Sequence, residues 1–185
     1  MKRLGFATLT LLLPAALSAQ QADPITTSLK QAGGQYAGWL TAAFDSVPES
    51  KYSFKPTEKQ LTIGMVATHL ENANYIICSG FSGMPWKPGA KDSLPEATRA
   101  TWPKDTLMTR LRASFDFCNQ AFASMNDAKL AESMEVGPPN NRRTIPKARY
   151  ALIYVTDLVD HYSQMANYMR LNGMTPPSSL PRKAP

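Results

Sequence analysis

The 185-residue sequence is poor in the residue types that most often mark metal and redox sites, with only two cysteines and two histidines. Cys78 and Cys118 are too far apart for a C-x-x-C redox motif, a thiolate zinc cluster or a haem attachment site. Beyond residue 19 no stretch approaches about eighteen consecutive apolar residues, so we expect no transmembrane helix there. No segment alternates apolar and polar residues with a period of two, which argues against a protein built from β-sheet.

Charge is also sparse, with 18% charged residues and a formal net charge of +6. Basic residues are scattered, apart from the pairs Arg142–Arg143 and Arg182–Lys183, and no basic stripe alternates with aromatic residues. Since nucleic-acid-binding proteins concentrate positive charge on one face, we expect no nucleic-acid partner. The 43% of hydrophobic residues is enough for the core of one soluble globular domain.

The first nineteen residues differ in composition from the rest of the chain. Lys2 and Arg3 precede the apolar run GFATLTLLLPAAL, and the segment ends in small residues at Ala19. This pattern predicts a secretory signal peptide over residues 1–19, followed by one domain over residues 20–185. A membrane anchor is the alternative, but the run is short for a bilayer span. We therefore expect an exported protein, periplasmic or secreted, that has no membrane association after cleavage.

Four long segments place apolar residues every three or four positions, which is the spacing of amphipathic helices. They cover residues 25–44, 62–80, 103–125 and 146–171. A short helix is expected over residues 127–134, and the proline- and glycine-rich residues 83–103 and 137–144 are predicted loops. The pattern predicts an all-α fold, a four-helix bundle with long loops between the second and third and between the third and fourth helices.

Each cysteine lies on the apolar stripe of a predicted helix, Cys78 on the second and Cys118 on the third. They are therefore either two buried thiols or one disulfide that joins two helices. The oxidising compartment expected for an exported protein favours the disulfide.

Both histidines lie where a bundle could bring them together. His69 is on or beside the buried stripe of the second helix, and Asp157 and His161 share one face of the fourth helix, one turn apart. If these helices are neighbours, two imidazoles and one carboxylate converge, and this donor set suits a divalent metal. The alternative is one core histidine and one surface histidine. Glu71 and Asp160 are expected on other, solvated faces.

Three segments carry a family resemblance: residues 52–80, the FDFC of residues 115–118, and residues 160–179. The last follows the pattern H-Y-x-Q-x-x-x-Y-x-R-x-N-G-x-x-P-P-S. Over residues 25–179 the sequence resembles the DinB-like superfamily of bacterial four-helix proteins, also called DinB/YfiT-like metalloenzymes, and within it the exported branch. The resemblance implies a four-helix bundle that relatives often assemble into a homodimer.

The resemblance also implies a divalent metal, Zn, Ni or Fe, between the second and fourth helices. Its ligands in the family are one histidine of the second helix and an H-x-x-x-H pair of the fourth. These positions correspond to His69, Asp157 and His161, so aspartate replaces the usual middle histidine. Aspartate has a shorter, charged side chain, and as an anionic ligand it would make the metal a weaker Lewis acid.

Two kinds of enzyme with a small-molecule substrate are expected from such a site. The resemblance suggests a thiol-dependent S-transferase that uses a metal-activated thiolate, and the second is a metal-dependent hydrolase, which needs only water. Export counts against the first, because low-molecular-weight thiol cosubstrates are cytosolic. The alternative is a non-catalytic bundle that binds a small ligand or serves as a scaffold, with a degenerate metal site. No catalytic residue is assigned beyond the three metal ligands.

Overall fold

A computed structural model describes residues 22–181 of the chain. The predicted signal peptide, residues 1–19, lies outside these residues. Four long helices form the bundle: α1 (Pro24–Ser46), α2 (Ile63–Ser82), α4 (Lys104–Ala123) and α6 (Lys147–Leu171). All four were predicted, with ends that differ by only a few residues. The predicted four-helix fold is therefore confirmed.

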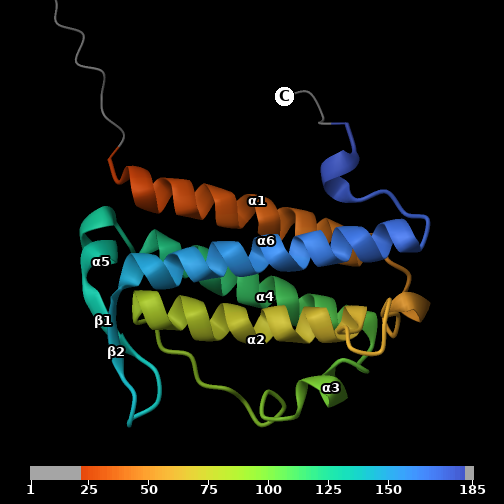
Figure 1. The fold of residues 1–185 in the computed structure, drawn as a ribbon, viewed down its shortest axis with the longest axis horizontal. Helices are drawn as coiled ribbons and strands as arrows, with labels where there is room; N and C mark the ends of the chain where they lie inside the picture. The colour runs from red at the N-terminus through yellow and green to blue at the C-terminus, as the bar shows by residue number, and fades with distance from the viewer. Residues whose placement is uncertain (1–21, 182–185) are drawn as a thin grey trace, which may run out of the picture.

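The helices do not simply alternate in direction along the chain. After α2, the connection over residues 83–103 returns along the bundle, so that α4 starts at the same end as α2 (Figure 1). Contacts between Asn74 and Ser114 and between Cys78 and Cys118 agree with this parallel arrangement. Helix α2 packs on α4 on one side and on α6 on the other, and α1 packs mainly on α6. The second and fourth long helices, α2 and α6, are therefore neighbours, as a site formed by His69, Asp157 and His161 requires.

Local signals explain where α2 begins and ends. The Thr62 side chain accepts a hydrogen bond from the Met65 backbone N–H at 3.1 Å, which caps the helix. The helix runs past the expected stop at Ser79–Gly80 and ends at Gly83, whose φ of +75° is a left-handed conformation that glycine adopts readily. Gly173 follows α6 with a φ of +73°.

The shorter elements lie in the connections. They are η1 (Glu49–Lys51), α3 (Glu96–Arg99), α5 (Asp127–Ala131), η2 (Pro177–Ser179) and an antiparallel hairpin of β1 (Ser133–Val136) and β2 (Arg143–Pro146). In the hairpin, Ser133 pairs with Pro146 and Val136 with Arg143. The short helix predicted over residues 127–134 thus stops at Ala131, and its last residues are strand. Four-residue, largely exposed strands are too short to show a periodic pattern, which is why the sequence did not reveal them.

The core lies between the four long helices and contains Leu40, Phe44, Leu70, Leu111 and Leu158, all fully buried. Both cysteines are also fully buried and form a disulfide between α2 and α4, with the Cα atoms 5.3 Å apart. Of the two alternatives for the cysteines, the structure has the disulfide. Within residues 22–181, no helix combines the length and apolar character needed to cross a bilayer.

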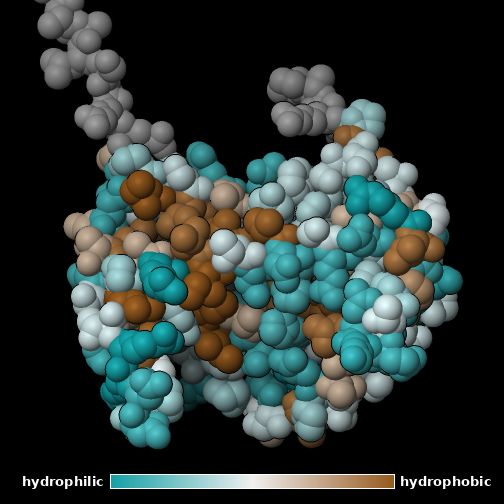
Figure 2. Space-filling view, viewed as in Figure 1, coloured by the Kyte–Doolittle hydropathy of each residue, from teal (hydrophilic) through white to brown (hydrophobic). Residues whose placement is uncertain are grey.

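One face of the molecule is divided into an apolar and a polar half. Figure 2 shows apolar side chains gathered over the beginning of α6 and the end of α2, and hydrophilic side chains over the other ends of these helices. The exposed large apolar side chains of α2 and α6 include Ile76, Leu152, Ile153 and Val159.

Candidate metal centre

The structure brings His69, Asp157 and His161 together between α2 and α6. The Asp157 Oδ1 atom lies 3.7 Å from Nε2 of His161 and 4.0 Å from Nε2 of His69. The two imidazole ring centroids are 4.8 Å apart. One donor atom from each of the three residues lies within 4.8 Å of the other two. The three predicted site residues therefore form one cluster.

The three side chains differ in their exposure to solvent. His161 is buried, the Asp157 side chain is 23% exposed, and the His69 side chain is 37% exposed. The cluster is therefore open on the α2 side, and the least exposed donor is on α6. A groove of about 830 Å³ runs beside His161 along the second half of α6, where Gln164, Asn167 and Arg170 line it. Neither His69 nor Asp157 lines this groove.

The geometry of the donors fits a divalent cation. Nitrogen and oxygen ligands at about 2.1 Å from a tetrahedral metal are about 3.4 Å apart, close to the 3.7 and 4.0 Å separations around Asp157 Oδ1. These separations are too long for direct hydrogen bonds. The other oxygen of Asp157, Oδ2, is buried and has no hydrogen-bond partner among residues 22–181. A buried carboxylate oxygen without a partner is costly, and a cation would remove that cost.

The pKa of Asp157 reflects this environment. Burial raises the pKa of the carboxyl group, and the nearby Asp160 adds to the increase. The neighbouring His161 and His69 act in the opposite direction but do not cancel the effect of burial. A nearby cation would favour the ionised form and so oppose the effect of burial.

A chain of hydrogen bonds fixes the tautomer of His161. The Tyr168 hydroxyl lies 3.0 Å from the Leu61 carbonyl oxygen, which can only accept, so the hydroxyl donates there. It therefore accepts from Nε2 of Gln164 at 2.8 Å. This leaves Oε1 of Gln164 facing Nδ1 of His161 at 3.0 Å, so that Nδ1 carries the proton. The lone pair of a neutral His161 is then on Nε2, the atom that faces Asp157.

Three residues of this site were not recognised in the sequence. Gln164 and Tyr168 follow His161 at helical spacing, so their position on its face of α6 could have been inferred. Glu96, whose Oε2 atom lies 3.7 Å from Nδ1 of His69, comes from α3 in the long loop and has no local signal.

The prediction for Glu71 was wrong, whereas Asp160 is exposed as expected. Glu71 does point away from His69, but the face it occupies packs against α4, and its side chain is only 4% exposed. Its oxygens pair with Arg99 at 3.0 Å and Arg110 at 2.6 Å. A second hollow, of about 620 Å³ beside Arg110 and Trp102, is lined by none of the three donor residues.

Comparison with solved structures supports the fold. A DinB-like protein from Bacillus cereus ATCC 10987 is 21% identical, with a TM-score of 0.65 over 82% of this chain and 95% of that chain. YfiT from Bacillus subtilis, described as a probable metal-dependent hydrolase with an unusual four-helix bundle topology, is 15% identical, with a TM-score of 0.60 over 89% of this chain and 95% of that chain.

The mycothiol-dependent maleylpyruvate isomerase is 12% identical, with a TM-score of 0.58 over 77% of this chain and 60% of that chain. These identities are too low to transfer an activity. No curated protein matches the sequence significantly. The family model of the DinB superfamily matches residues 39–165, which include all three donor residues and most of the bundle. The chain therefore belongs to the DinB superfamily.

Proposed function

We propose that the protein is a metal-dependent hydrolase that binds one divalent cation through His69, Asp157 and His161. The observation that carries this proposal is the convergence of His69 and His161 on Oδ1 of Asp157, a carboxylate whose other oxygen, Oδ2, is buried and has no partner within the described residues. Two neutral imidazoles and one carboxylate suit Zn²⁺, Ni²⁺ or Fe²⁺. The set contributes three ligands, which leaves positions for water and substrate.

Each residue has a defined task in this proposal. When bound, a divalent cation of this kind activates water and polarises a substrate carbonyl or phosphoryl oxygen. His161 presents Nε2 because Gln164 holds the proton on Nδ1. Asp157 contributes the negative charge that offsets the charge of the cation. A small-molecule substrate would bind in the groove beside His161, the one donor residue of the three that lines it.

Hydrolysis is favoured over thiol transfer by the disulfide between Cys78 and Cys118. Disulfides persist in oxidising compartments, where a reduced thiol cosubstrate is scarce. The disulfide likewise supports the proposal that the protein is exported after removal of residues 1–19. Mass spectrometry of protein recovered from the periplasm or medium tests this, with a mature chain that begins at Gln20 as the expected result. An uncleaved chain would contradict it.

Metal analysis tests the proposed site directly. Protein purified without chelators should contain close to one equivalent of a transition metal, and His69→Ala and His161→Ala should each abolish it. The matched control is Asn167→Ala, which alters an exposed residue of α6 that lines the groove but lies outside the donor set. Equal metal content in wild type and both histidine variants would refute the site.

A substrate screen separates hydrolysis from the other candidate functions. The loaded protein should cleave an ester, amide or phosphoester without added thiol, and the histidine variants should be inactive. Turnover only in the presence of a low-molecular-weight thiol would favour the transferase. Binding of metal without turnover in either screen would favour a small-ligand-binding bundle. The specific argument for that alternative is Asp157, because an anionic ligand makes the metal a weaker Lewis acid.

A further inference from the structure

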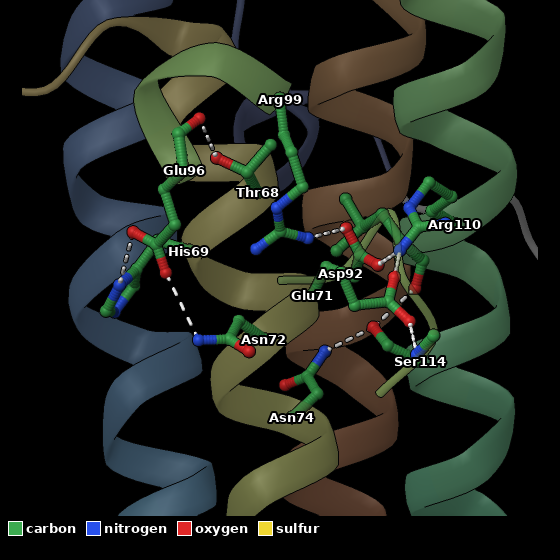
Figure 3. Close-up of polar contacts among 12 residues, drawn as sticks. Thr68, His69, Glu71, Asn72, Asn74, Asp92, Glu96, Arg99, Arg110 and Ser114 are labelled. Carbon is green, nitrogen blue, oxygen red and sulfur yellow. Dashed lines mark hydrogen bonds and ion pairs between the residues drawn. The ribbon is translucent and has the colours of Figure 1, made fainter. Parts of the chain in front are cut away.

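The connection between α2 and α4 approaches the candidate metal centre at one residue, Glu96. This residue begins α3 and contacts three residues of α2 (Figure 3). Its Oε2 atom lies 3.7 Å from Nδ1 of His69, and its Oε1 atom accepts a hydrogen bond from Asn72 at 3.3 Å. Its backbone carbonyl accepts from the Thr68 hydroxyl at 3.5 Å. The carboxylate of Glu96 is therefore held beside the imidazole by more than one contact.

The contact with Glu96 is on the side of His69 that faces away from Asp157. Nδ1 faces Glu96 and Nε2 faces Asp157. A carboxylate next to Nδ1 favours the tautomer that carries its proton there, which leaves the lone pair on Nε2 for a metal. A movement of about 0.7 Å would shorten the contact to a hydrogen bond of about 3.0 Å. Glu96 thus faces Nδ1 of His69, just as Gln164 faces Nδ1 of His161.

A buried ion pair anchors α3 in this position. Arg99, at the other end of α3, is 2% exposed and donates to Glu71 at 3.0 Å. The other oxygen of Glu71 pairs with Arg110, which also pairs with Asp92 in the same connection. If α3 moved away, the buried Glu71 would lose one of its two guanidinium partners, which is unfavourable. Figure 3 shows His69 and Glu71 pointing to opposite sides of α2, with α3 reaching both.

We propose that Glu96 is a positioning residue of the metal centre, which orients His69 through Nδ1, and that the Glu71–Arg99 pair holds Glu96 in place. The inference rests on the proposed metal site. It makes the α2–α4 connection part of the centre, although none of its residues ligates the metal. Outer carboxylates of this kind typically change metal affinity by about 10- to 100-fold.

The test is the affinity for Zn²⁺, measured by competition with a chromophoric chelator. Glu96→Gln should weaken binding by about tenfold, because the amide still accepts from Asn72 but loses its charge. Glu135→Gln makes the same change on the exposed hairpin strand β1 and should bind as wild type does. The thermal midpoints of the metal-free proteins should coincide, and the visible spectrum of bound Co²⁺ should change only in Glu96→Gln.

A double-mutant cycle tests the anchoring. Arg99→Met should also weaken Zn²⁺ binding, and in that background Glu96→Gln should have little further effect, because the carboxylate is no longer held. Fully additive losses would overturn the role of Arg99. Equal affinities of wild type and Glu96→Gln would overturn the positioning role while leaving the metal site intact. Failure of the wild-type protein to bind Zn²⁺ would overturn both this proposal and the proposed function.

Discussion

The two sides of α2 hold their neighbours in different ways. Toward α4, the helix is tied by the Cys78–Cys118 disulfide, by the Glu71 pairs with Arg99 and Arg110, and by the hydrogen bond from Asn74 to Ser114 at 2.8 Å. Toward α6, its polar contacts to Asp157 and His161 are too long for hydrogen bonds, and one carboxylate oxygen lacks a partner. Each side also holds buried polar atoms without a partner in the part of the chain that the structure describes: Asn74 Oδ1 and the Nε atoms of Arg99 and Arg110 on the first, and Asp157 Oδ2 on the second. Direct ion pairs and a covalent bond join the first side, whereas the second side has donor groups that the proposed cation would bring together.

The contrast is sharpest between two carboxylates, Glu71 and Asp157. Each oxygen of Glu71 meets its own guanidinium group, so the charge is neutralised from within the chain. Among residues 22–181, the basic side chains paired with Asp157 are two imidazoles, and neither is close enough to donate a hydrogen bond. Burial of an acid is thus no evidence of a ligand by itself. The difference lies in whether the chain supplies the partners, and the following predictions test that difference.

The largest effect is expected from Glu71→Ala. The substitution leaves the buried Arg99 without its partner, and we expect the free energy of unfolding to fall by about 3–5 kcal/mol. Urea unfolding of the metal-free protein measures the loss, with the exposed Glu135→Ala as a control that should change little. A loss below about 1 kcal/mol would show that the pair is not a principal tie between α2, α3 and α4.

The disulfide should come second. Replacement of both Cys78 and Cys118 by alanine removes a covalent link across a sequence separation of 40 residues. We expect a loss of about 2–4 kcal/mol in urea unfolding. Zn²⁺ affinity should remain at the wild-type value, because the donors lie on the other side of α2. A large loss of affinity without unfolding would mean that the two sides are coupled.

Asp157→Asn should have the opposite effect, with little change in stability and a large loss of Zn²⁺ affinity. The metal-free protein should keep its stability within about 1 kcal/mol, because the neutral amide removes a poorly partnered buried charge. Zn²⁺ binding should weaken by about 100-fold or more, which corresponds to about 2.7 kcal/mol. Asp160→Asn is the matched control, since the same change is made at an exposed residue three positions along α6. Unchanged Zn²⁺ affinity would remove Asp157 from the donor set.

A smaller effect is expected from Tyr168→Phe, which breaks the hydrogen-bond chain that orients His161. Loss of the hydroxyl should lower the free energy of unfolding by about 1 kcal/mol. Zn²⁺ affinity should fall by about tenfold, because Gln164 is no longer fixed with Oε1 toward His161. Tyr150→Phe serves as the control, since its hydroxyl makes no hydrogen bond within residues 22–181. Equal affinity in the two variants would show that the chain does not tune the centre.

The smallest effect is a dependence of stability on pH. Because burial raises the pKa of Asp157, the folded metal-free protein binds a proton more readily than the unfolded chain does. Stability attributable to this residue therefore increases as the pH falls toward the ordinary pKa of aspartate, and it decreases as the pH rises through the raised pKa. The measurement is the stability of wild type minus that of Asp157→Asn from pH 7 to pH 4. A difference that falls with decreasing pH would contradict the assignment.

The sequence predicted the features that depend on helical spacing. The four long helices and the shared face of Asp157 and His161 follow from neighbouring residues along the chain. Their convergence with His69 needed only that α2 and α6 be adjacent, which the family resemblance implied. Local sequence patterns are sufficient to predict a side chain's position where its own helix determines that position.

The features that the sequence did not reveal depend on distant segments. Glu71 was assigned to the correct side of its helix, but only the packing of α4 and α3 shows that this side is buried. Glu96 reaches His69 because its loop is anchored by Arg99, far from any periodic pattern. The β1–β2 hairpin was not predicted because two four-residue strands have too few positions for an alternation of apolar and polar residues to be recognised.

The parallel course of α2 and α4 has a consequence for how such a protein could diversify. Because the chain must travel back along the bundle before α4 starts, residues 83–103 pass next to the donors outside the four long helices. Apart from residues that anchor it, such as Glu96 and Arg99, this connection is open to exchange. Substitutions or insertions at its other positions would change the surface beside the donor residues, while the four long helices and the three donors stay the same. Chimaeras that carry the α2–α4 connection of one family member on the helices of another would test whether this connection sets the selectivity for small molecules.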